Sequence, residues 1–582
     1  MMRHFLAILA LAASAAAAPP TPTPIMRVKD VKPGMKGFGL TTFHGTTPER
    51  FEVEVVGVLR HFLPKQDLVL IRMDHPILRH AGIVAGMSGS PVYVDGKLVG
   101  AVAYGFPFTK DPIAGVTPIE NMLDDMHRPA RGPERTPLAF ELPPSPARWL
   151  ARSPLPSSSS SSGIQRAALP LSAAGFPESV FPDMEKIFSP WRIEPVQGGG
   201  AGDATGGPTR FEPGAPIGVV LARGDVSMVG TGTVTHVEGD AVAGFGHPFF
   251  GAGELYVPIA SAEIHMVIPS VFRSFKLSSP LGALGTLVQD RQAAIVGVTG
   301  RRAEMMPVRL EVKSGSEPPA VFEAEIVRHR LLTPMLASIV ALSGVRQAAG
   351  DMADVLVTVR GTLAVRGHGP LVLETRSFSR SGIDAGDIAS ARPIAAISAL
   401  LGNPFEPARI DRLDLEVSAD FRSDFGQIEE VRLPADEVDA GTRVPARVVV
   451  RTYGGATETV TIPFDVPRAA IGDTLKVVVA SGGLVEPDRA PPESFADLLA
   501  YLAKDFPNDA LVLSVYRPDE GVTLRGAVIP DLPGSALDVL RPGASSRRGR
   551  PYKSAARIVV PYRRMVFGKA EIDVKVRKEM QQ

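Results

Sequence analysis

The chain has 582 residues, which is too long for a single hydrophobic core, so we expect three or four domains. Its 62 basic and 62 acidic residues give a formal net charge of zero, which argues against nucleic acid as a partner. The absence of cysteine excludes disulfides, thiol catalysis and cysteine-ligated zinc, and we expect no cofactor and no metal. The many glycines (57) and prolines (54) favour turns and short strands over long helices.

The first residues have the pattern of a secretory signal peptide. Arg3 and His4 precede an apolar run over 5–13, and small residues follow at 14–18. Because proline after the scissile bond hinders cleavage, we predict that residues 1–17 are removed. The apolar run is short for a membrane span, so an uncleaved anchor is the less favoured alternative. We therefore expect an exported protein, periplasmic, extracellular or associated with the cell envelope, with no transmembrane span in the mature chain.

Composition divides the rest of the chain into six units. They are a β-rich unit at 26–125, a Pro/Ser/Gly-rich linker at 126–210, a second β-rich unit at 211–350, a mixed α/β connector at 351–407, a β-sandwich-like domain at 408–480, and a small α+β region with a basic tail at 481–582.

Helices are expected at three places in these units. The apolar stretch 331–345 predicts a buried helix, an Ala/Ile-rich stretch predicts another near 388–401, and Ser494 can cap a third. The tail from 541 to 582 has twelve Lys/Arg against three Asp/Glu. It is either a solvated strand-and-turn region or a surface for an anionic partner such as lipid or cell wall.

The most informative motif is the run Gly86-Met87-Ser88-Gly89-Ser90-Pro91. It places a serine hydroxyl between two glycines, where a substrate backbone can approach and backbone N–H groups can converge as in an oxyanion hole. Asp95-Gly96, between two apolar runs, predicts a two-residue hairpin turn directly after it. The alternative is a Gly/Ser turn with no chemistry.

A nucleophilic serine needs a base, and the base needs an orienting group. His247 is the best candidate for the base, because it follows a predicted strand and the glycines around it leave its ring accessible. His75 and His80 lie nearer in sequence but fit surface positions better. Asp74, at the end of an apolar strand, is the candidate for the carboxylate. The alternatives are a structural histidine and an Asp-His-Pro turn.

These motifs together resemble the serine peptidases of the stage IV sporulation protein B (SpoIVB) family. The similar stretches are 82–91, 95–102 and 115–123 around the serine, 230–235 and 244–247 around the histidine, and 279–287. The resemblance implies that Ser88 is the nucleophile, His247 the base and Asp74 the orienting carboxylate. It also implies an oxyanion hole at the amides of Gly86 and Ser88.

The order of the segments departs from that family, because here the serine segment precedes the histidine segment. We therefore expect a mainly β chain with a circularly permuted, chymotrypsin-like double β-barrel, followed by β-sandwich-like units. A triad is defined by geometry and not by chain order, so the site survives if the linker is long enough.

By the same resemblance, an extended substrate would pair with residues of one strand, namely Ala101, Val102, Ala103 and Tyr104. The predicted function is an exported serine endopeptidase that makes limited, regulated cuts in protein substrates. Residues 351–582 would position the substrate or an envelope protein partner. The alternatives are a catalytically inactive peptidase-like scaffold or binding protein of the envelope, and a surface adhesin.

Overall fold

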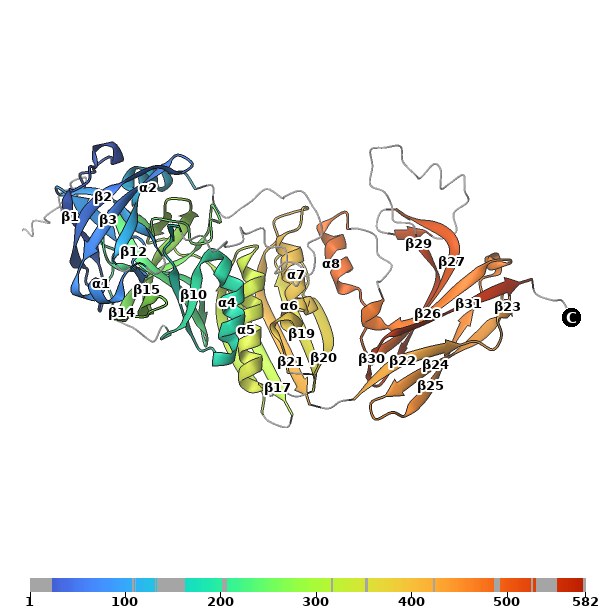
Figure 1. The fold of residues 1–582 in the computed structure, drawn as a ribbon. Coiled ribbons are helices and arrows are strands. Elements are labelled where there is room, and N and C mark those ends of the chain that lie inside the picture. Colours follow the sequence, from blue (N-terminus) through green and yellow to red (C-terminus); the bar gives the residue numbers. More distant parts are fainter. Residues whose placement is uncertain are drawn as a thin grey trace, which may run out of the picture.

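A computed structural model of the chain describes residues 23–130 (except 107, 108 and 110), 132, 163–200, 207–315, 318–350, 354–380, 382–421, 424–485, 492–524, 527–529 and 552–578. The expected signal peptide lies outside these residues. The prediction of a mainly β fold with a double barrel and further β units is confirmed. Figure 1 shows the two barrels at the N-terminal end, a layer of sheet and helices next to them, and a separate sandwich at the C-terminal end.

The first barrel carries the serine motif and closes on itself through six strands. They pair in the order β5-β1-β2-β3-β7-β6, and β6 returns to β5. Their bounds are β1 Lys36–Thr41, β2 Glu49–Leu63, β3 Gln66–Asp74, β5 Pro91–Val94, β6 Lys97–Gly105 and β7 Ile113–Pro118. Alternating strand residues such as Val69, Ile71 and Met73 fill the interior. The predicted hairpin is present, because Val94 pairs with Lys97 and both turn residues have positive φ.

The second barrel carries the histidine motif. Its pairings also run in a circuit, in the order β12-β13-β16-β15-β14-β11, with β11 returning to β12. The bounds are β11 Pro216–Gly224, β12 Ser227–Glu238, β13 Ala241–Gly244, β14 Val257–Ile268, β15 Ser274–Asp290 and β16 Ile295–Thr299. Among the contacts that join the barrels, the short strand β4 (Val84–Ala85) pairs with β15, and α2 (Ile119–Met126) lies in an apolar cluster that both barrels share.

A sheet beyond the second barrel continues from β11. Strand β18 pairs with the end of β11, and the order from there is β18-β17-β21-β19-β20. The bounds are β17 Met305–Ser314, β18 Ala320–Val327, β19 Val355–Val365, β20 Leu371–Ser379 and β21 Ile410–Asp420. The predicted buried helix is α5 (Leu332–Ala348), which packs on β17 and β18, and the Ala/Ile-rich stretch forms α6 (Ala385–Ser390) and α7 (Arg392–Leu401).

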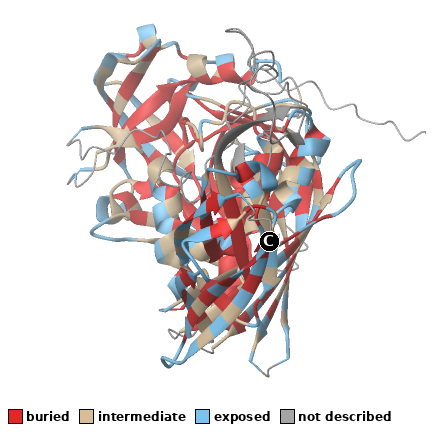
Figure 2. Ribbon diagram, turned by 90° about the vertical axis from the view of Figure 1, so that its right-hand side faces the viewer, coloured by how far each residue is buried: buried red, intermediate tan, exposed pale blue. Residues whose placement is uncertain are grey.

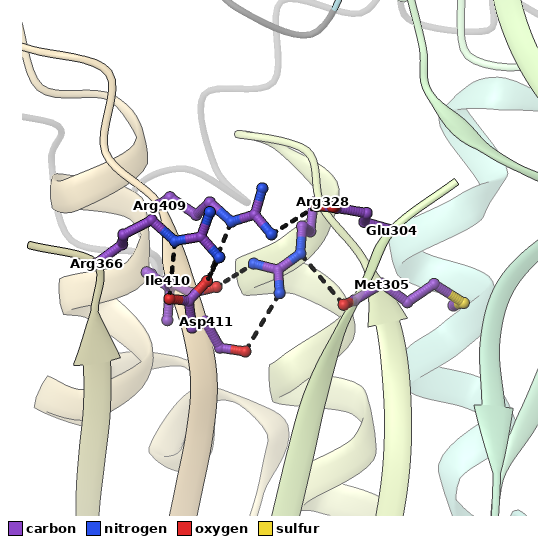
Figure 3. Close-up of polar contacts among 7 residues, drawn as sticks. All are labelled: Glu304, Met305, Arg328, Arg366, Arg409, Ile410 and Asp411. Atoms are coloured by element: carbon purple, nitrogen blue, oxygen red, sulfur yellow. Dashed lines mark hydrogen bonds and ion pairs between the residues drawn. The ribbon is translucent and has the colours of Figure 1, made fainter. Parts of the chain in front are cut away.

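Three arginines link the strands at one end of this sheet through hydrogen bonds and ion pairs (Figure 3). Arg328 donates to the carbonyls of Met305 and Asp411, both at 3.2 Å, and so joins β17 to β21. Arg366 forms a bidentate pair with the Asp411 carboxylate at 3.0 and 2.9 Å, and Arg409 reaches the same carboxylate at 3.0 Å. Strands β19, β20 and β21 are therefore part of one sheet, whereas the sequence predicted a connector followed by the start of a sandwich.

The described part of the predicted linker is also structured. Residues 163–197 form β8 (Gln165–Arg166), β9 (Leu169–Ala174), α4 (Phe181–Phe188) and β10 (Ile193–Gln197). Strand β9 pairs with β12. Leu171, Met184 and Phe188 are buried in the main core, which is the apolar core that the second barrel shares with the adjoining sheet and helices. The linker prediction is wrong here, because the proline- and serine-rich flanks obscured a short apolar alternation.

The C-terminal sandwich has its own apolar core. One sheet has the order β25-β24-β22-β30 and the other β23-β31-β26-β27, with β29 also on β27. The bounds are β22 Phe425–Arg432, β23 Glu437–Asp439, β24 Arg443–Thr452, β25 Thr457–Asp465, β26 Thr474–Ser481, β27 Ala510–Leu524, β29 Tyr552–Pro561, β30 Met565–Phe567 and β31 Lys569–Arg577. The sandwich thus reaches residue 577 rather than 480, since strands of the basic tail complete both sheets.

Residues between these strands form the third predicted helix. It is α8 (Phe495–Ala503), whose N-cap Ser494 accepts from the Asp497 amide at 3.1 Å.

In Figure 2 the buried residues lie along the facing strands, and exposed residues lie at turns and outer faces. Within the described residues, no helix combines the length and apolar character needed to cross a bilayer.

The separate core of the sandwich leads to a test of independent folding. Phe464 is 1% exposed in that core, so Phe464→Ala should lower the free energy of unfolding of the sandwich by about 3–5 kcal/mol. Calorimetry should show one transition moving down and the transition of the barrels unchanged. Tyr453→Ala, at a side chain that is 61% exposed, is the matched control. A shift of every transition with Phe464→Ala would contradict separate folding.

Candidate active site

The serine lies on a tight loop between β4 and β5, at the boundary of the two barrels. Gly86 and Gly89 have φ of +96° and +100°, a conformation that favours glycine. A Cβ on Gly89 would lie 1.9 Å from the carbonyl oxygen of Thr233 and 2.5 Å from the Phe245 nitrogen. Glycine is therefore required here so that the loop can press against the second barrel.

The second barrel holds the backbone of this loop through β12. The Thr233 amide donates to the Ser88 carbonyl at 2.8 Å, and the Thr233 hydroxyl donates to the Gly86 carbonyl at 2.9 Å. The Thr235 hydroxyl donates to the Gly89 carbonyl at 2.7 Å. These three bonds fix the carbonyls of the loop to the barrel that carries the histidine.

His247 lies on the turn after β13. The preceding residues Phe245 and Gly246 both have positive φ, and Gly246 lies directly against β6 of the first barrel. The Thr117 hydroxyl, also from the first barrel, donates to the Gly246 carbonyl at 2.6 Å. This contact brings His247 Nε2 to 2.9 Å from Ser88 Oγ, although 159 positions separate them in the chain.

The other ring nitrogen determines the tautomer. His247 Nδ1 lies 2.8 Å from the carbonyl oxygen of Pro248. Since a carbonyl can only accept, Nδ1 must carry the hydrogen, and the lone pair of Nε2 faces the Ser88 hydroxyl. This is the arrangement in which a histidine can remove the serine proton.

The pair is almost completely enclosed, which affects its protonation. Ser88 is 0% and His247 2% exposed. Burial is the main cause that lowers the pKa of His247 to about 3, and the charges of Arg166 and Arg192 act in the same direction. The ring is therefore neutral at physiological pH, as a general base requires.

The structure does not bring Asp74 to this pair. Asp74 ends β3 beside the inward-facing Met73, so strand alternation turns its side chain outward. It forms a bidentate ion pair with Arg79 on α1 (Pro76–Ala81), at 2.6 and 2.8 Å, and this pairing lowers the pKa of Asp74. The predicted orienting carboxylate is thus replaced at Nδ1 by the backbone carbonyl of Pro248.

The other two histidines weighed for the site, and two aspartates in hairpin turns, have structural roles. His75 caps α1, with Nδ1 accepting from the Ile77 amide at 3.3 Å, and it stacks on Phe43. His80 is an exposed residue of the same helix. Asp95 is part of the predicted hairpin turn, and Asp240 lies in the turn between β12 and β13.

Asp290, the last residue of β15, was not predicted from the sequence. Its carboxylate is buried and accepts from the amides of Phe249 and Phe250, each at 2.8 Å, and of Ala252 at 3.1 Å. It thereby holds the turn that follows His247 and Pro248. Burial raises the pKa of Asp290, while these amides oppose that rise. Nothing in the sequence around Asp290 distinguishes it from a turn residue, because its partners lie 38–41 positions away.

A second missed residue, Lys276, lies beneath the serine loop. Its ammonium group is 2.8 Å from Thr41 Oγ1 and 3.4 Å from Thr233 Oγ1, and a Cβ on Gly86 would lie 3.2 Å from its stem. Burial lowers the pKa of Lys276 to about 7. Lys276 is thus linked through Thr233 to the backbone of the serine loop.

The remaining predicted site residues lie around the serine. Within the described residues, the Ser88 amide donates to no protein acceptor, whereas its neighbours Met87 and Gly89 donate to carbonyls at 3.1 and 2.8 Å. The residues expected to pair with substrate, 101–104, are buried in β6. Val102 of that strand exchanges hydrogen bonds with the serine loop, at 2.8 Å to Gly89 and 2.9 Å to Ser90.

Comparison with known families gives one match. A model of the SpoIVB peptidase S55 family matches residues 11–123, a stretch that contains Ser88. The resemblance to SpoIVB peptidases is therefore confirmed for this part of the chain, and it indicates a serine peptidase. Searches among curated proteins and solved structures give no match.

The position of Asp74 leads to a direct test. We expect Asp74→Asn to leave the rate of Ser88 labelling by a fluorophosphonate within about twofold of wild type, because Asp74 contacts Arg79 and not His247. Loss of an orienting aspartate in a Ser-His-Asp triad costs about 10⁴ in turnover. A fall approaching that size would contradict the geometry described here. Arg79→Gln, which removes the partner in the same ion pair, is the matched control.

The buried His247 leads to a pH prediction. With its pKa lowered to about 3, the ring should stay neutral at pH 5 in ¹⁵N NMR spectra of the ring nitrogens. Because the unfolded chain binds the proton at higher pH, the contribution of His247 to stability is present above about pH 6.5 and is lost as pH falls toward 3. His247→Gln, which also assigns the signal, should remove that part of the acid sensitivity. A protonation midpoint near 6.5 would be the contrary result.

Proposed function

We propose that this protein is an exported serine endopeptidase that cuts protein substrates at few sites, using Ser88 and His247. The observation that carries the proposal is the 2.9 Å contact between Ser88 Oγ and His247 Nε2, with Nδ1 committed to Pro248. Export rests on the signal-like residues 1–17, and the protein substrate on the resemblance of residues 11–123 to SpoIVB peptidases. Regulated cutting is the part of the proposal that rests on family resemblance alone.

In the proposed mechanism, Ser88 Oγ attacks the carbonyl carbon of the scissile peptide bond while His247 Nε2 takes the hydroxyl proton. The oxyanion accepts hydrogen bonds from the amides of Ser88 and Gly86. His247 then gives the proton to the leaving amine, and the C–N bond breaks. Water, deprotonated by the same nitrogen, then attacks the acyl carbon, and His247 returns this proton to Ser88 Oγ as the ester bond breaks.

The orienting group in this mechanism is neutral. The Pro248 carbonyl fixes the ring and the tautomer, as the carboxylate of a triad does, but it supplies no full charge to the imidazolium that forms during attack. We therefore expect slower turnover than in peptidases with a complete triad. Slow turnover suits limited processing better than digestion.

A second candidate function is a peptide-binding protein that keeps the barrels without catalysis. It is favoured by the near-complete burial of Ser88 and His247 and by the absence, in the described part of the chain, of a carboxylate on Nδ1. Such a protein would bind extended peptides and leave them intact.

Labelling of the mature protein with a fluorophosphonate probe separates the two candidates. We expect the wild type to form an adduct on Ser88, no adduct in Ser88→Ala, and a rate reduced by at least about 10³ in His247→Ala, because the unassisted hydroxyl is a weak nucleophile. Mass spectrometry of peptides locates the adduct. Ser90→Ala, two residues away on the same loop, is the control that should still be labelled. A wild type without an adduct, and without any cleavage of casein that Ser88→Ala abolishes, would rule out the peptidase.

A further inference from the structure

A segment of the chain itself lies along the strand that the proposed peptidase would offer to its substrate. Strand β8 pairs antiparallel with the end of β6, with Arg166 opposite Tyr104 and Gln165 opposite Gly105. The next residue continues the pairing, because the Ala167 amide donates to the Ala103 carbonyl at 2.8 Å. Three consecutive residues of this segment thus extend the edge of the first barrel.

The direction of the segment is that of a substrate crossing a two-barrel site. From Gln165 to Ala167 it runs toward the part of β6 that bonds the serine loop. Beyond Ala168 it becomes β9, which pairs with β12 of the second barrel, with Leu171 opposite Gly230. The chain therefore passes from the serine barrel to the histidine barrel near the junction where Ser88 and His247 meet.

Several contacts hold the segment in place. Arg192 donates through Nε to the Arg166 carbonyl at 3.1 Å, and its own carbonyl accepts from the Leu169 amide at 3.1 Å. Ala167 and Ala168 are 9% and 4% exposed. Ala103, which accepts from the Ala167 amide, also lies against Gly246, because a Cβ on Gly246 would be 2.9 Å from the Ala103 Cβ; the segment therefore runs close to the residue before His247. Small side chains at 167 and 168 allow the backbone to approach the junction closely.

The segment is nevertheless not bound as a peptide about to be cut. Cleavage would place the carbonyl of the residue before the scissile bond in the oxyanion hole. In the described residues, the Ser88 amide donates to no protein carbonyl, that of Ala167 included. The segment occupies the binding edge and leaves the amide of the nucleophile unused.

We propose that residues 165–168 are a tethered, substrate-like strand that occupies the peptide-binding edge of β6. The proposal rests on the function proposed above. An extended polypeptide must displace this strand, adding its own strand to β6 as in other cases of β-strand addition. The favoured ligands are extended peptides with small residues next to the serine, as Ala167 and Ala168 are in the tethered strand.

The first arm of the test measures binding without catalysis. In the Ser88→Ala background, a fluorescein-labelled peptide of the sequence Gly-Ile-Gln-Arg-Ala-Ala is titrated with the full chain, with and without Ala167→Pro. Proline has no amide hydrogen, so the tethered strand loses its bond to Ala103. We expect tighter peptide binding by about fivefold, the ratio that corresponds to one neutral hydrogen bond. Ala167→Ser keeps the amide and is the matched control.

A second variant allows the proposal to be tested even if Ala167→Pro does not fold. Arg192→Ala removes the bond to the Arg166 carbonyl and should also strengthen peptide binding, whereas Ala167→Ser should not. Equal affinity of the peptide for all the folded variants would overturn the proposal, as would a peptide that fails to bind any of them.

The second arm measures fluorophosphonate labelling with Ser88 intact, and it separates this proposal from the proposed function. Faster labelling of Ala167→Pro than of wild type supports both. Labelling of wild type with no gain in the variant, together with equal peptide affinities, overturns the tethered strand and leaves the peptidase. Stronger peptide binding with no labelling of any variant overturns the peptidase and leaves the strand as the occupant of a peptide-binding edge.

Discussion

The site depends on the contact between the backbone of the serine loop and strand β12. Hydrogen bonds from Thr233 and Thr235 hold the carbonyls of Gly86, Ser88 and Gly89. With its carbonyls held by the second barrel, the loop directs the Ser88 hydroxyl toward the histidine, and the lack of a side chain at Gly89 allows the close approach. Ser88 therefore belongs by sequence to one barrel and by its contacts to both.

This contact also explains why the order of the two barrels along the chain matters little. Ser88 and His247 meet because Gly246 packs on β6 and Thr233 packs on the serine loop, and neither contact requires one barrel to precede the other. The part of the intervening segment that the structure describes at 163–197 does more than provide length. It crosses the junction, pairs with both barrels and contributes to the main core.

The sequence predicted those elements that depend on residues close together in the chain. The hairpin after the serine, the cap of α8 and the buried α5 follow from short patterns, and the approach of His247 to Ser88 followed from two motifs of one resemblance. Asp74 was expected near His247 because it ends an apolar strand, but the alternation beside Met73 turns its side chain outward to Arg79. Asp290 and Lys276 were missed because their partners lie far away in the chain. The strands at 163–197 and the true extent of the sandwich depend on long-range pairing, which composition does not report.

We propose that Ser88 and His247 form one reactive site across the two barrels. A peptidyl chloromethyl ketone tests it directly, because the serine adds to the ketone and the histidine is alkylated by the same molecule. Mass mapping after incubation of the full chain with an Ala-Ala chloromethyl ketone should place the alkylation on His247 Nε2, and Ser88→Ala should abolish it. Alkylation of another residue, or of His247 at the same rate in Ser88→Ala, would contradict a site shared by Ser88 and His247.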